Sequence, residues 1–346
     1  MNYYAKRIGQ TLFTIWAVLT ITFVLIRFMP GGPLDYLRAQ VIAGNIGQGS
    51  SSGLQGSTDQ LAAFNRLAEL YINIDPDKPI HEQYIQYMSQ LAQGDLGQSI
   101  YFTAPVENVL LPAIPWTVFL GTIAVFISFV SRVVVGAALA YKEGTRFDAG
   151  GTTALVWGHS LPFYIIGILL LYVFGYQWGW FPTSGRYNAD AVAGLNWPFI
   201  SGILNHAALP VAALAWASFG AGAIAMRANA IQVLGEDYVR TAKLRGIGSR
   251  RITILYVARN AILPMYTGML IQIGFIFAGS IILERIFVYR GVGWYMFRAI
   301  QADDYPLMMG GFILITVTVA IAMLVADLTY GIVDPRVSRG ESDESF

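Results

Sequence analysis

Six long apolar stretches, separated by polar or glycine-rich segments, dominate the pattern of this chain. A helix that crosses a lipid bilayer needs about 20 mostly apolar residues. Taken singly, each stretch would also suit a helix buried inside a soluble protein, but six of them in one chain favour a membrane. We therefore predict six membrane-spanning helices, over residues 8–29, 114–141, 152–175, 209–231, 262–283 and 307–333.

The composition supports a membrane protein. Hydrophobic residues make up 55% of the 346 residues and charged residues only 12%, which is about half the charged fraction of a soluble domain. The net charge of +1 indicates no general attraction to nucleic acid. The absence of cysteine excludes disulfides and thiolate chemistry. Tryptophans lie at or near predicted span ends, as interfacial aromatic residues should: Trp116, Trp178, Trp180 and Trp294.

The first apolar stretch has a cleaved signal peptide as its alternative interpretation. Lys6 and Arg7 precede it, as basic residues precede the apolar part of a signal peptide. However, the stretch is longer than a typical signal core, and no small-residue cleavage pattern follows before Pro30. We therefore expect a retained helix over residues 1–29.

The short loops carry Lys and Arg unevenly, and the cytoplasmic side of a membrane protein holds the excess. Placing the N-terminus in the cytoplasm leaves Arg186, Arg285, Arg290 and Arg298 in the short outer loops. The same choice places these residues inside: Lys6, Arg7, Lys142, Arg146, Arg240, Lys243, Arg245, Arg250, Arg251, Arg259, Arg336 and Arg339. The predicted fold is therefore an all-α membrane protein with six spans and both termini cytoplasmic, including a short tail over residues 334–346.

The segment between the first two spans, residues 30–113, is an extracytoplasmic insertion in this orientation. Its residues 43–57 are rich in glycine and serine and resemble a flexible linker. Two short helices are expected after it, one with apolar residues at helical spacing from Leu61 to Tyr71, and one that begins near Pro79 and stops at Gly94. We expect a small helical cap; a plain linker is the alternative.

The predicted core, residues 114–333, contains a basic segment over residues 232–261, which is cytoplasmic in this orientation. Gly246 and Gly248 predict a break between two short helices, and Ser249 is placed to cap the second. On that second helix the spacing puts Ile252, Leu255, Tyr256 and Arg259 on one face. An apolar stripe of this kind favours docking on a partner surface.

Several motifs, taken in order, give the chain a family resemblance. The run from Glu236 to Pro264, EDYVRTAKLRGIGSRRITILYVARNAILP, resembles the cytoplasmic loop of ABC-importer permeases. The chain more narrowly resembles the B-type permease subunit of the dipeptide/oligopeptide/nickel family of binding-protein-dependent ABC importers. The supporting motifs are the opening helix with its Pro-Gly motif, GDLGQS at 94–99, LPAIPWT at 111–117, WGWFPTSG at 178–185, DYPLMMG at 304–310 and VDPRV at 333–337.

The resemblance implies that the cytoplasmic segment contains a coupling helix that docks in a groove of an ATPase subunit. It implies the following coupling residues: Tyr238, Arg240, Thr241, Ala242, Lys243, Gly246, Arg250 and Arg251. Arg240, Thr241 and Arg259 differ from the residues of many distant importers. The implied partners are two ATPases, a homologous second permease and an extracytoplasmic solute-binding protein.

Energy for transport is expected from those partners. The chain has no GxxxxGK[ST] sequence to hold nucleotide phosphates, so ATP and Mg would be bound by the ATPases and no cofactor or metal by this chain. The three histidines, His81, His159 and His206, are scattered along the sequence and are interpreted as structural. We therefore predict a transport subunit of the cytoplasmic membrane without catalytic residues.

Charged residues at membrane depth are expensive and are functional candidates. Arg227 and Asp327 lie near the predicted cytoplasmic ends of spans four and six. One hypothesis is that they form a charge pair or bracket a gate; the other is that both extend to the interface. Glu284 and Arg285 would face either a substrate vestibule or water. No role is assigned to Arg132.

A stand-alone secondary transporter or channel is the alternative function. It would favour internal repeats or interrupted spans in corresponding halves, and no convincing repeat is present. A membrane enzyme lacks a catalytic constellation, and a pure scaffold would leave the basic segment unexplained. The substrate, whether a peptide, an oligosaccharide or a nickel chelate, cannot be read from the sequence.

Overall fold

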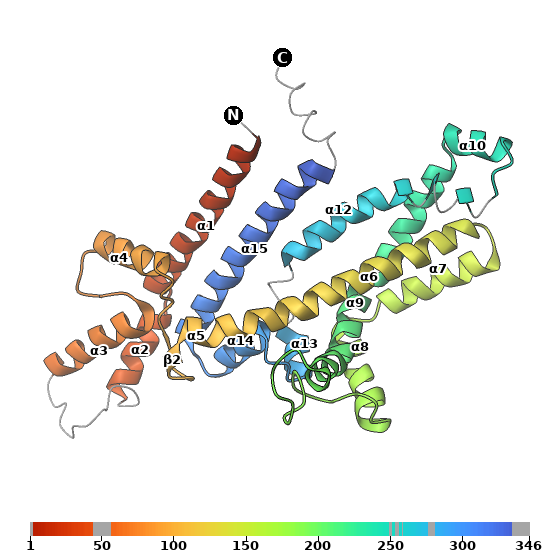
Figure 1. Ribbon diagram of the computed structural model, residues 1–346. Coiled ribbons are helices and arrows are strands. Elements are labelled where there is room, and N and C mark those ends of the chain that lie inside the picture. The colour runs from red at the N-terminus through yellow and green to blue at the C-terminus, as the bar shows by residue number, and fades with distance from the viewer. Residues whose placement is uncertain are drawn as a thin grey trace, which may run out of the picture. The chain divides into compact units, whose positions relative to one another are not determined.

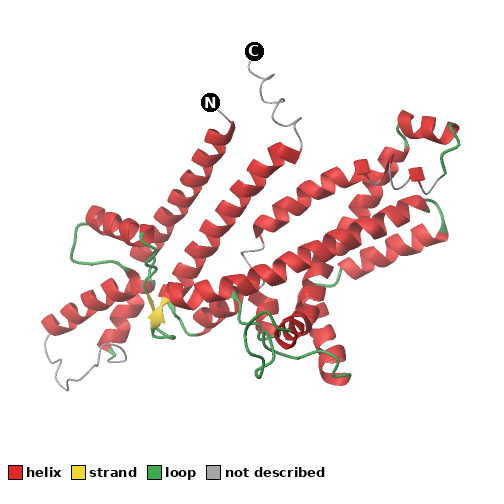
Figure 2. Ribbon diagram, viewed as in Figure 1, coloured by secondary structure: helices red, strands yellow, loops and turns green. Residues whose placement is uncertain are grey.

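The computed structural model describes residues 3–43, 57–248, 251–252, 256–257, 259–275 and 281–333. Helices make up most of this part, and the strands found in it are the two-residue β1 (Gln98–Ser99) and β2 (Ala104–Pro105), paired antiparallel (Figure 2). The chain divides into two compact units, which are described separately. The first comprises Met1–Pro115 and Val292–Val325, and the second Trp116–Gly291 and Ala326–Phe346.

The first unit is built on two long helices and a group of short ones. Its helices are α1 (Tyr3–Phe28), α2 (Pro33–Ile42), α3 (Ser57–Ile72), α4 (Ile80–Ala92), α5 (Val106–Leu110), the 3-10 turn η1 (Leu111–Ala113), α14 (Val292–Gln301) and most of α15 (Tyr305–Val333) (Figure 1). A buried cluster joins α1, α2, α3, α4 and α15 through Phe23, Leu37, Ala68, Tyr87 and Ile313. The predicted helices after residues 61 and 79 are confirmed as α3 and α4.

Gly31 makes the turn between α1 and α2. Its φ of +70° lies in the left-handed region, where a residue without a Cβ is unstrained. Its N–H donates to Asp35 Oδ2 at 2.9 Å, and Pro33 opens α2 at a position where its missing N–H is no loss. The Pro-Gly motif after the first helix therefore redirects the chain into the outer segment.

The second unit is organised around one long helix, α9 (Trp197–Leu234). It packs against α7 (Arg146–His159), α8 (Phe163–Leu170) and α12 (Arg259–Phe275) (Figure 1). The unit also holds nearly all of α6 (Ile114–Tyr141), the π-helix η2 (Leu171–Gln177), α10 (Asp237–Leu244) and α13 (Ile281–Ile286). Two buried clusters hold it together, one around Leu120, Leu209 and Tyr289 and one around Met226, Val239 and Met265.

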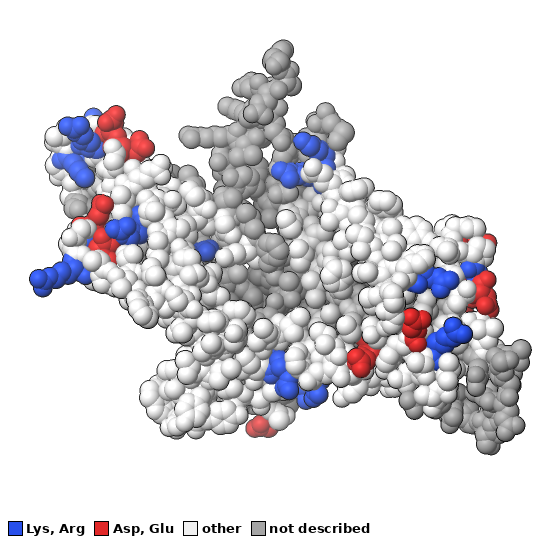
Figure 3. Space-filling model, turned by 180° about the vertical axis from the view of Figure 1, so that it is seen from behind, with Lys and Arg blue, Asp and Glu red and all other residues white. Residues whose placement is uncertain are grey.

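Four helical stretches in the described residues are long and apolar enough to cross a membrane. They are Ala5–Ile42, Val106–Tyr141, Trp197–Leu234 and Tyr305–Val325, and they confirm helices at predicted spans one, two, four and six. Exposed apolar side chains on these helices suit contact with lipid, since Phe13 and Phe126 are each 63% exposed. Figure 3 shows a face on which charged side chains gather in a few places and wide areas carry none.

The third predicted span, residues 152–175, is wrong as a single straight helix. The structure has two helices there, α7 and α8 continued by η2, and they are bent by 92° at the break between His159 and Phe163. Pro162 explains the break, because it has no N–H to donate and disfavours helical geometry at the residue before it. These two helices count as a fifth candidate span only if together they cross the membrane once.

The remaining span predictions differ in extent. Span four begins earlier than residue 209, because Asn196 caps α9 by accepting from the Phe199 N–H at 2.9 Å. Span five is represented by α12, which ends at Phe275, and by α13 after it. Residues 276–280 lie outside the described part, so the predicted continuous helix over 262–283 is not confirmed. The glycine- and serine-rich stretch also lies mostly outside it.

Candidate functional site

The segment predicted to be cytoplasmic and to couple to an ATPase contains a short amphipathic helix, α10. Val239 and Ala242, 0% and 4% exposed, point into the cluster formed with Met226 and Ala230 of α9. The helix ends before Gly246, whose φ of +74° allows the chain to reverse there. The exposed residues of α10 and the turn are Asp237, Tyr238, Arg240, Thr241, Lys243, Leu244, Arg245 and Gly246.

Two expectations for this segment are corrected by burial. Ala242 is not at the surface, so its side chain contacts this chain's own core. Of the apolar stripe that was expected to need a partner protein, Ile252 is 2% exposed and Tyr256 is partly buried, and both pack in the same cluster. Val257, which was not assigned to the stripe, joins the cluster at 1% exposure. Arg251 is exposed. Ser249, Arg250 and Leu255 lie outside the described residues, as does the side chain of Arg259.

Leu244 is a surface feature that the sequence reasoning missed. Its side chain is 83% exposed at the end of α10, between the exposed basic residues Lys243 and Arg245. The spacing contained a signal for this exposure, because Leu244 lies four residues after Arg240 and so shares its outward helical face. Tyr238 is also tied down, since its hydroxyl accepts from Asn260 Nδ2 of α12 at 2.8 Å. The segment thus presents charged and apolar side chains on a helix that is held against α9 and α12.

Arg227 has a different partner from the one the sequence suggested. Its Nε and Nη2 donate to Asp148 Oδ1 and Oδ2 at 2.5 and 2.7 Å, which makes a bidentate ion pair between α9 and the first turn of α7. Asp148 is buried and also accepts from the Gly144 N–H. Nε and Nη2 of Arg227 are thus held by Asp148, a partner that the charge-pair hypothesis with Asp327 did not include. The side chain of Asp327 lies outside the described part.

Glu284 faces neither water nor an open vestibule. It is 2% exposed and accepts from Thr117 Oγ1 of α6 at 2.8 Å, and Gly291 packs against it so closely that a Cβ there would lie 2.6 Å from Glu284 Oε2. The pKa of the neighbouring Tyr289 phenol is raised, mainly because Tyr289 is buried and in addition because of the charge on Glu284. Thr117 belongs to the LPAIPWT motif, so this motif holds a buried carboxylate. Arg285 is exposed.

Two motifs of the family resemblance meet in the first unit, although they lie far apart in sequence. Ser99 of GDLGQS donates to Asp304 Oδ2 of DYPLMMG at 2.5 Å, and both residues are 0% exposed. Asp304 also accepts from the Tyr101 N–H and, through Oδ1, from the Leu307 N–H at the start of α15. One buried carboxylate therefore joins the β1–β2 hairpin to the N-terminus of α15, one of the helices long and apolar enough to cross a membrane.

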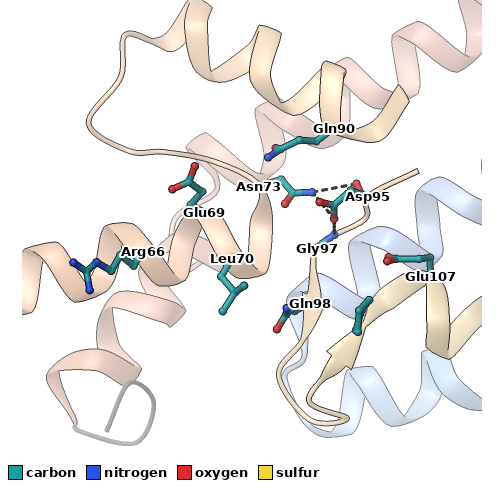
Figure 4. Close-up of a pocket in the computed structure, with 10 residues that line it drawn as sticks. Arg66, Glu69, Leu70, Asn73, Gln90, Asp95, Gly97, Gln98 and Glu107 are labelled. Carbon is teal, nitrogen blue, oxygen red and sulfur yellow. Dashed lines mark hydrogen bonds between the residues drawn. The ribbon is translucent and has the colours of Figure 1, made fainter. Parts of the chain in front are cut away.

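A pocket of about 440 Å³ lies beside this junction (Figure 4). Asn73 donates to Asp95, which in turn accepts from the Gly97 N–H at 2.9 Å and fixes one wall. Gln90 Oε1 and Glu107 Oε2 are buried and have no hydrogen-bond donor among the described residues. The charged lining residues are Arg66, Glu69, Asp95 and Glu107. The lining therefore favours a cationic group over an anionic one.

The histidines take no part in these sites. His206 is buried in α9 with Nδ1 2.7 Å from the Gly202 carbonyl oxygen, whereas His81 on α4 and His159 on α7 are exposed. Within the described residues no group of three or more His, Asp or Glu side chains is arranged to hold a metal ion.

Comparison with known proteins shows which family these features fit. Residues 132–339 match the family described as the binding-protein-dependent transport system inner membrane component. The chain is 30% identical to the di/tripeptide transport system permease protein DppB of Pseudomonas aeruginosa, covering 97% of this chain and 98% of that protein. It is also 30% identical to the dipeptide permease DppB of Bacillus subtilis, and 28% identical to the peptidoglycan transport system permease protein YejB of Agrobacterium fabrum, with 97% of each chain covered in both cases.

Proposed function

The chain belongs to the family of binding-protein-dependent transport system inner membrane components and is a permease subunit of an ABC importer, not an enzyme; on this premise we propose that it carries peptides across the cytoplasmic membrane. The observation that supports a peptide substrate is the similarity over nearly the whole length to permeases named for dipeptides and tripeptides. The relative named for peptidoglycan transport extends the proposal to peptide-bearing cell-wall fragments.

The proposed assembly has two permease subunits, two ATPases and an extracytoplasmic solute-binding protein. ATP and Mg are bound by the ATPases. This chain crosses the membrane six times with both termini in the cytoplasm, span three being the bent pair α7–α8 and span five being formed by α12 with the residues that follow it. The insertion between spans one and two, α2 to α5, lies outside. The distribution of Lys and Arg supports this orientation.

The coupling step is proposed to run through α10. Arg240, Lys243 and Leu244 on its exposed face contact the ATPase, together with Thr241 and Arg251, while Val239 and Ala242 pack the helix against α9. Arg250 is also proposed to take part. An apolar side chain rimmed by charges is the usual arrangement of a helix that docks in a groove. Side chains of α9, α10 and α12 pack in one cluster with Ile252 and Val257. A displacement of α10 by the ATPase is therefore transmitted to α9 and α12 through this packing.

The experiment that tests this proposal is affinity purification of the chain from native membranes in mild detergent, followed by mass spectrometry. We expect a second permease and two ATPases in stoichiometric amounts, with peptide released from the accompanying binding protein on denaturation. Repeated recovery of the chain alone, in a form that transports solute without ATPases, would contradict the proposed assembly and support a secondary transporter.

A further inference from the structure

Arg132 is buried in the middle of a membrane helix. It is 4% exposed and belongs to the inward stripe of α6, which also contains Leu120, Ala124, Ser128 and Gly136. At 1.5 Å per residue it lies about 13 Å from the cytoplasmic end of α6 at Tyr141, which is more than an extended arginine side chain spans. The guanidinium therefore cannot reach the aqueous interface as a terminal Lys or Arg does.

The fold makes room for this side chain at one position of α9. A Cβ on Gly222 would clash with Arg132 Cδ and lie 3.3 Å from its Cβ. On either side of it the two helices are in contact, through the Ser128 and Ser218 hydroxyls 2.8 Å apart and through Gly136, which packs on Met226. The aliphatic part of Arg132 is thus held between α6 and α9. Its Cζ lies 5.4 Å from the centroid of the Phe129 ring.

The head of this side chain has no anionic partner in the described part of the chain. Nε and Nη2 are both buried and make no hydrogen bond there. The buried carboxylates whose contacts are described in this unit are engaged elsewhere, Asp148 with Arg227 and Glu284 with Thr117. A desolvated cation–π contact contributes about 2 kcal/mol or more, but it supplies no counter-charge. A charge at membrane depth is costly and marks a substrate pathway or a relay.

Arg227 shows what the same atoms do when they are paired. Its Nε and Nη2 hold both oxygens of the Asp148 carboxylate. These are the two nitrogens that Arg132 leaves without a protein partner among the described residues, and their spacing matches a carboxylate, which accepts two parallel hydrogen bonds. The guanidinium of Arg227 therefore holds a carboxylate, whereas the same two nitrogens of Arg132 have no hydrogen-bond partner among the described residues.

We propose that Arg132 is a carboxylate-binding residue of the translocation pathway and receives the C-terminal carboxylate of a passing peptide. This inference rests on the proposed peptide transport. Because Nε and Nη2 are enclosed in this conformation, the carboxylate reaches them when α6 and α9 part, and the exchange between access states driven by the ATPases supplies that movement. A bound carboxylate would in turn favour the parted state.

The test compares two peptides in vesicles that contain the complete complex. Initial ATP-dependent uptake is measured for radiolabelled dialanine and for dialanine amide, with the same binding protein throughout, in wild type, R132Q, R132K and the control S128A one turn away. We expect R132Q to slow dialanine uptake about tenfold, which corresponds to about 1.4 kcal/mol, and to bring the acid-to-amide ratio close to one. R132K should keep part of the preference, and S128A all of it.

A second measurement covers variants that assemble poorly or vesicles that take up neither peptide. The unfolding midpoint of the purified complex is recorded in sodium acetate and in sodium chloride of equal ionic strength. We expect acetate to raise the midpoint of wild type and S128A relative to chloride, and not that of R132Q. A wild-type complex that responds to acetate but transports neither peptide would contradict peptide transport and leave the carboxylate site standing.

Other outcomes would overturn the proposal itself. Unchanged uptake and an unchanged acid-to-amide ratio in R132Q, together with the same acetate response as wild type, would show that Arg132 binds no carboxylate in transport. If D327N reproduced every effect of R132Q, the counter-charge would be that residue of the same chain. If R132Q abolished recovery of the second permease while the surviving complex kept its preference, the carboxylate would come from the partner subunit.

Discussion

The pair between Asp148 and Arg227 is the contact that most changes how the charged residues of this chain are understood. The sequence suggested that Arg227 lines a gate, because Arg227 and Asp327 lie near the predicted cytoplasmic ends of spans four and six. The structure instead gives it a buried carboxylate from the first turn of α7. Its direct effect is to fasten α7 to α9, so we assign it a positioning role.

We predict that D148N lowers the unfolding midpoint of the purified complex by several degrees, because it leaves the Arg227 guanidinium without its counter-charge in a half-buried site. D190N, a comparable change at an exposed residue of the same unit, should leave the midpoint within a degree or so. R227Q should resemble D148N. If D327N and not D148N matched R227Q, the pairing seen here would not be the one that stabilises the complex.

Asp304 offers a second residue-scale prediction. Replacing it by asparagine removes the charge that accepts from Ser99 and from two backbone N–H groups. Because hydrogen bonds to charged groups contribute about 1.5–3 kcal/mol each, D304N should lower the local unfolding free energy by about 2 kcal/mol. That corresponds to roughly 30-fold faster hydrogen exchange in residues 96–105.

Asp303 provides the matched control for that measurement. It is the adjacent carboxylate, it is exposed, and its φ of +51° is one that asparagine tolerates. D303N should therefore leave exchange in residues 96–105 unchanged. Equal exchange in D303N and D304N would show that the junction between the hairpin and α15 does not depend on the buried carboxylate.

At the scale of elements, the glycine turn after α10 is the feature on which coupling depends. Gly246 has φ +74° and no atom within 4 Å of the position of a Cβ, so alanine there adds backbone strain and no clash. The strain amounts to about 1–2 kcal/mol. It tilts the end of α10 and with it the exposed Leu244.

We predict that G246A lowers the stimulation of ATP hydrolysis by the loaded binding protein several-fold, with basal hydrolysis unchanged. Gly179 is the control, because it too has a positive φ, +64°, and open space around its Cβ position, but it lies in the segment after η2. G179A should leave the stimulation unchanged. If the stimulation fell by a similar factor in both variants, backbone strain outside the turn would be enough to reduce it. If G246A did not lower the stimulation, the turn would have no part in coupling.

The sequence predicted elements well where one kind of signal acted alone. Apolar length located α6 and α15 almost to the residue, and helical spacing located α3 and α4. It failed where a local signal interrupted a long apolar run, since Pro162 breaks span three and Asn196 starts α9 early. For sites, the basic segment was found from charge and glycine positions. The burial of Ala242 and Ile252 depends on α10 and the residues after it packing against α9, which spacing does not reveal. The Asp148–Arg227 pair likewise joins residues 79 positions apart.

At the scale of the whole molecule, the number of spans is the open structural prediction. Because the chain has no cysteine, a single introduced cysteine is the only thiol that a membrane-impermeant reagent can label. In intact cells we predict labelling of E82C and D190C, and protection of E143C and R245C until the membrane is opened. Labelling of D190C with protection of E143C requires the bent pair α7–α8 to cross as one span. The same accessibility for both would make the pair a re-entrant loop.

The central claim is that this chain transports peptides only as a subunit driven by ATPases. Its most direct test is uptake of radiolabelled dialanine into vesicles that contain the purified complex and its binding protein, with ATP or ADP supplied on the ATPase side. The account predicts uptake with ATP, none with ADP, and none from vesicles that contain this chain alone. Uptake by the chain alone, independent of ATP, would contradict it.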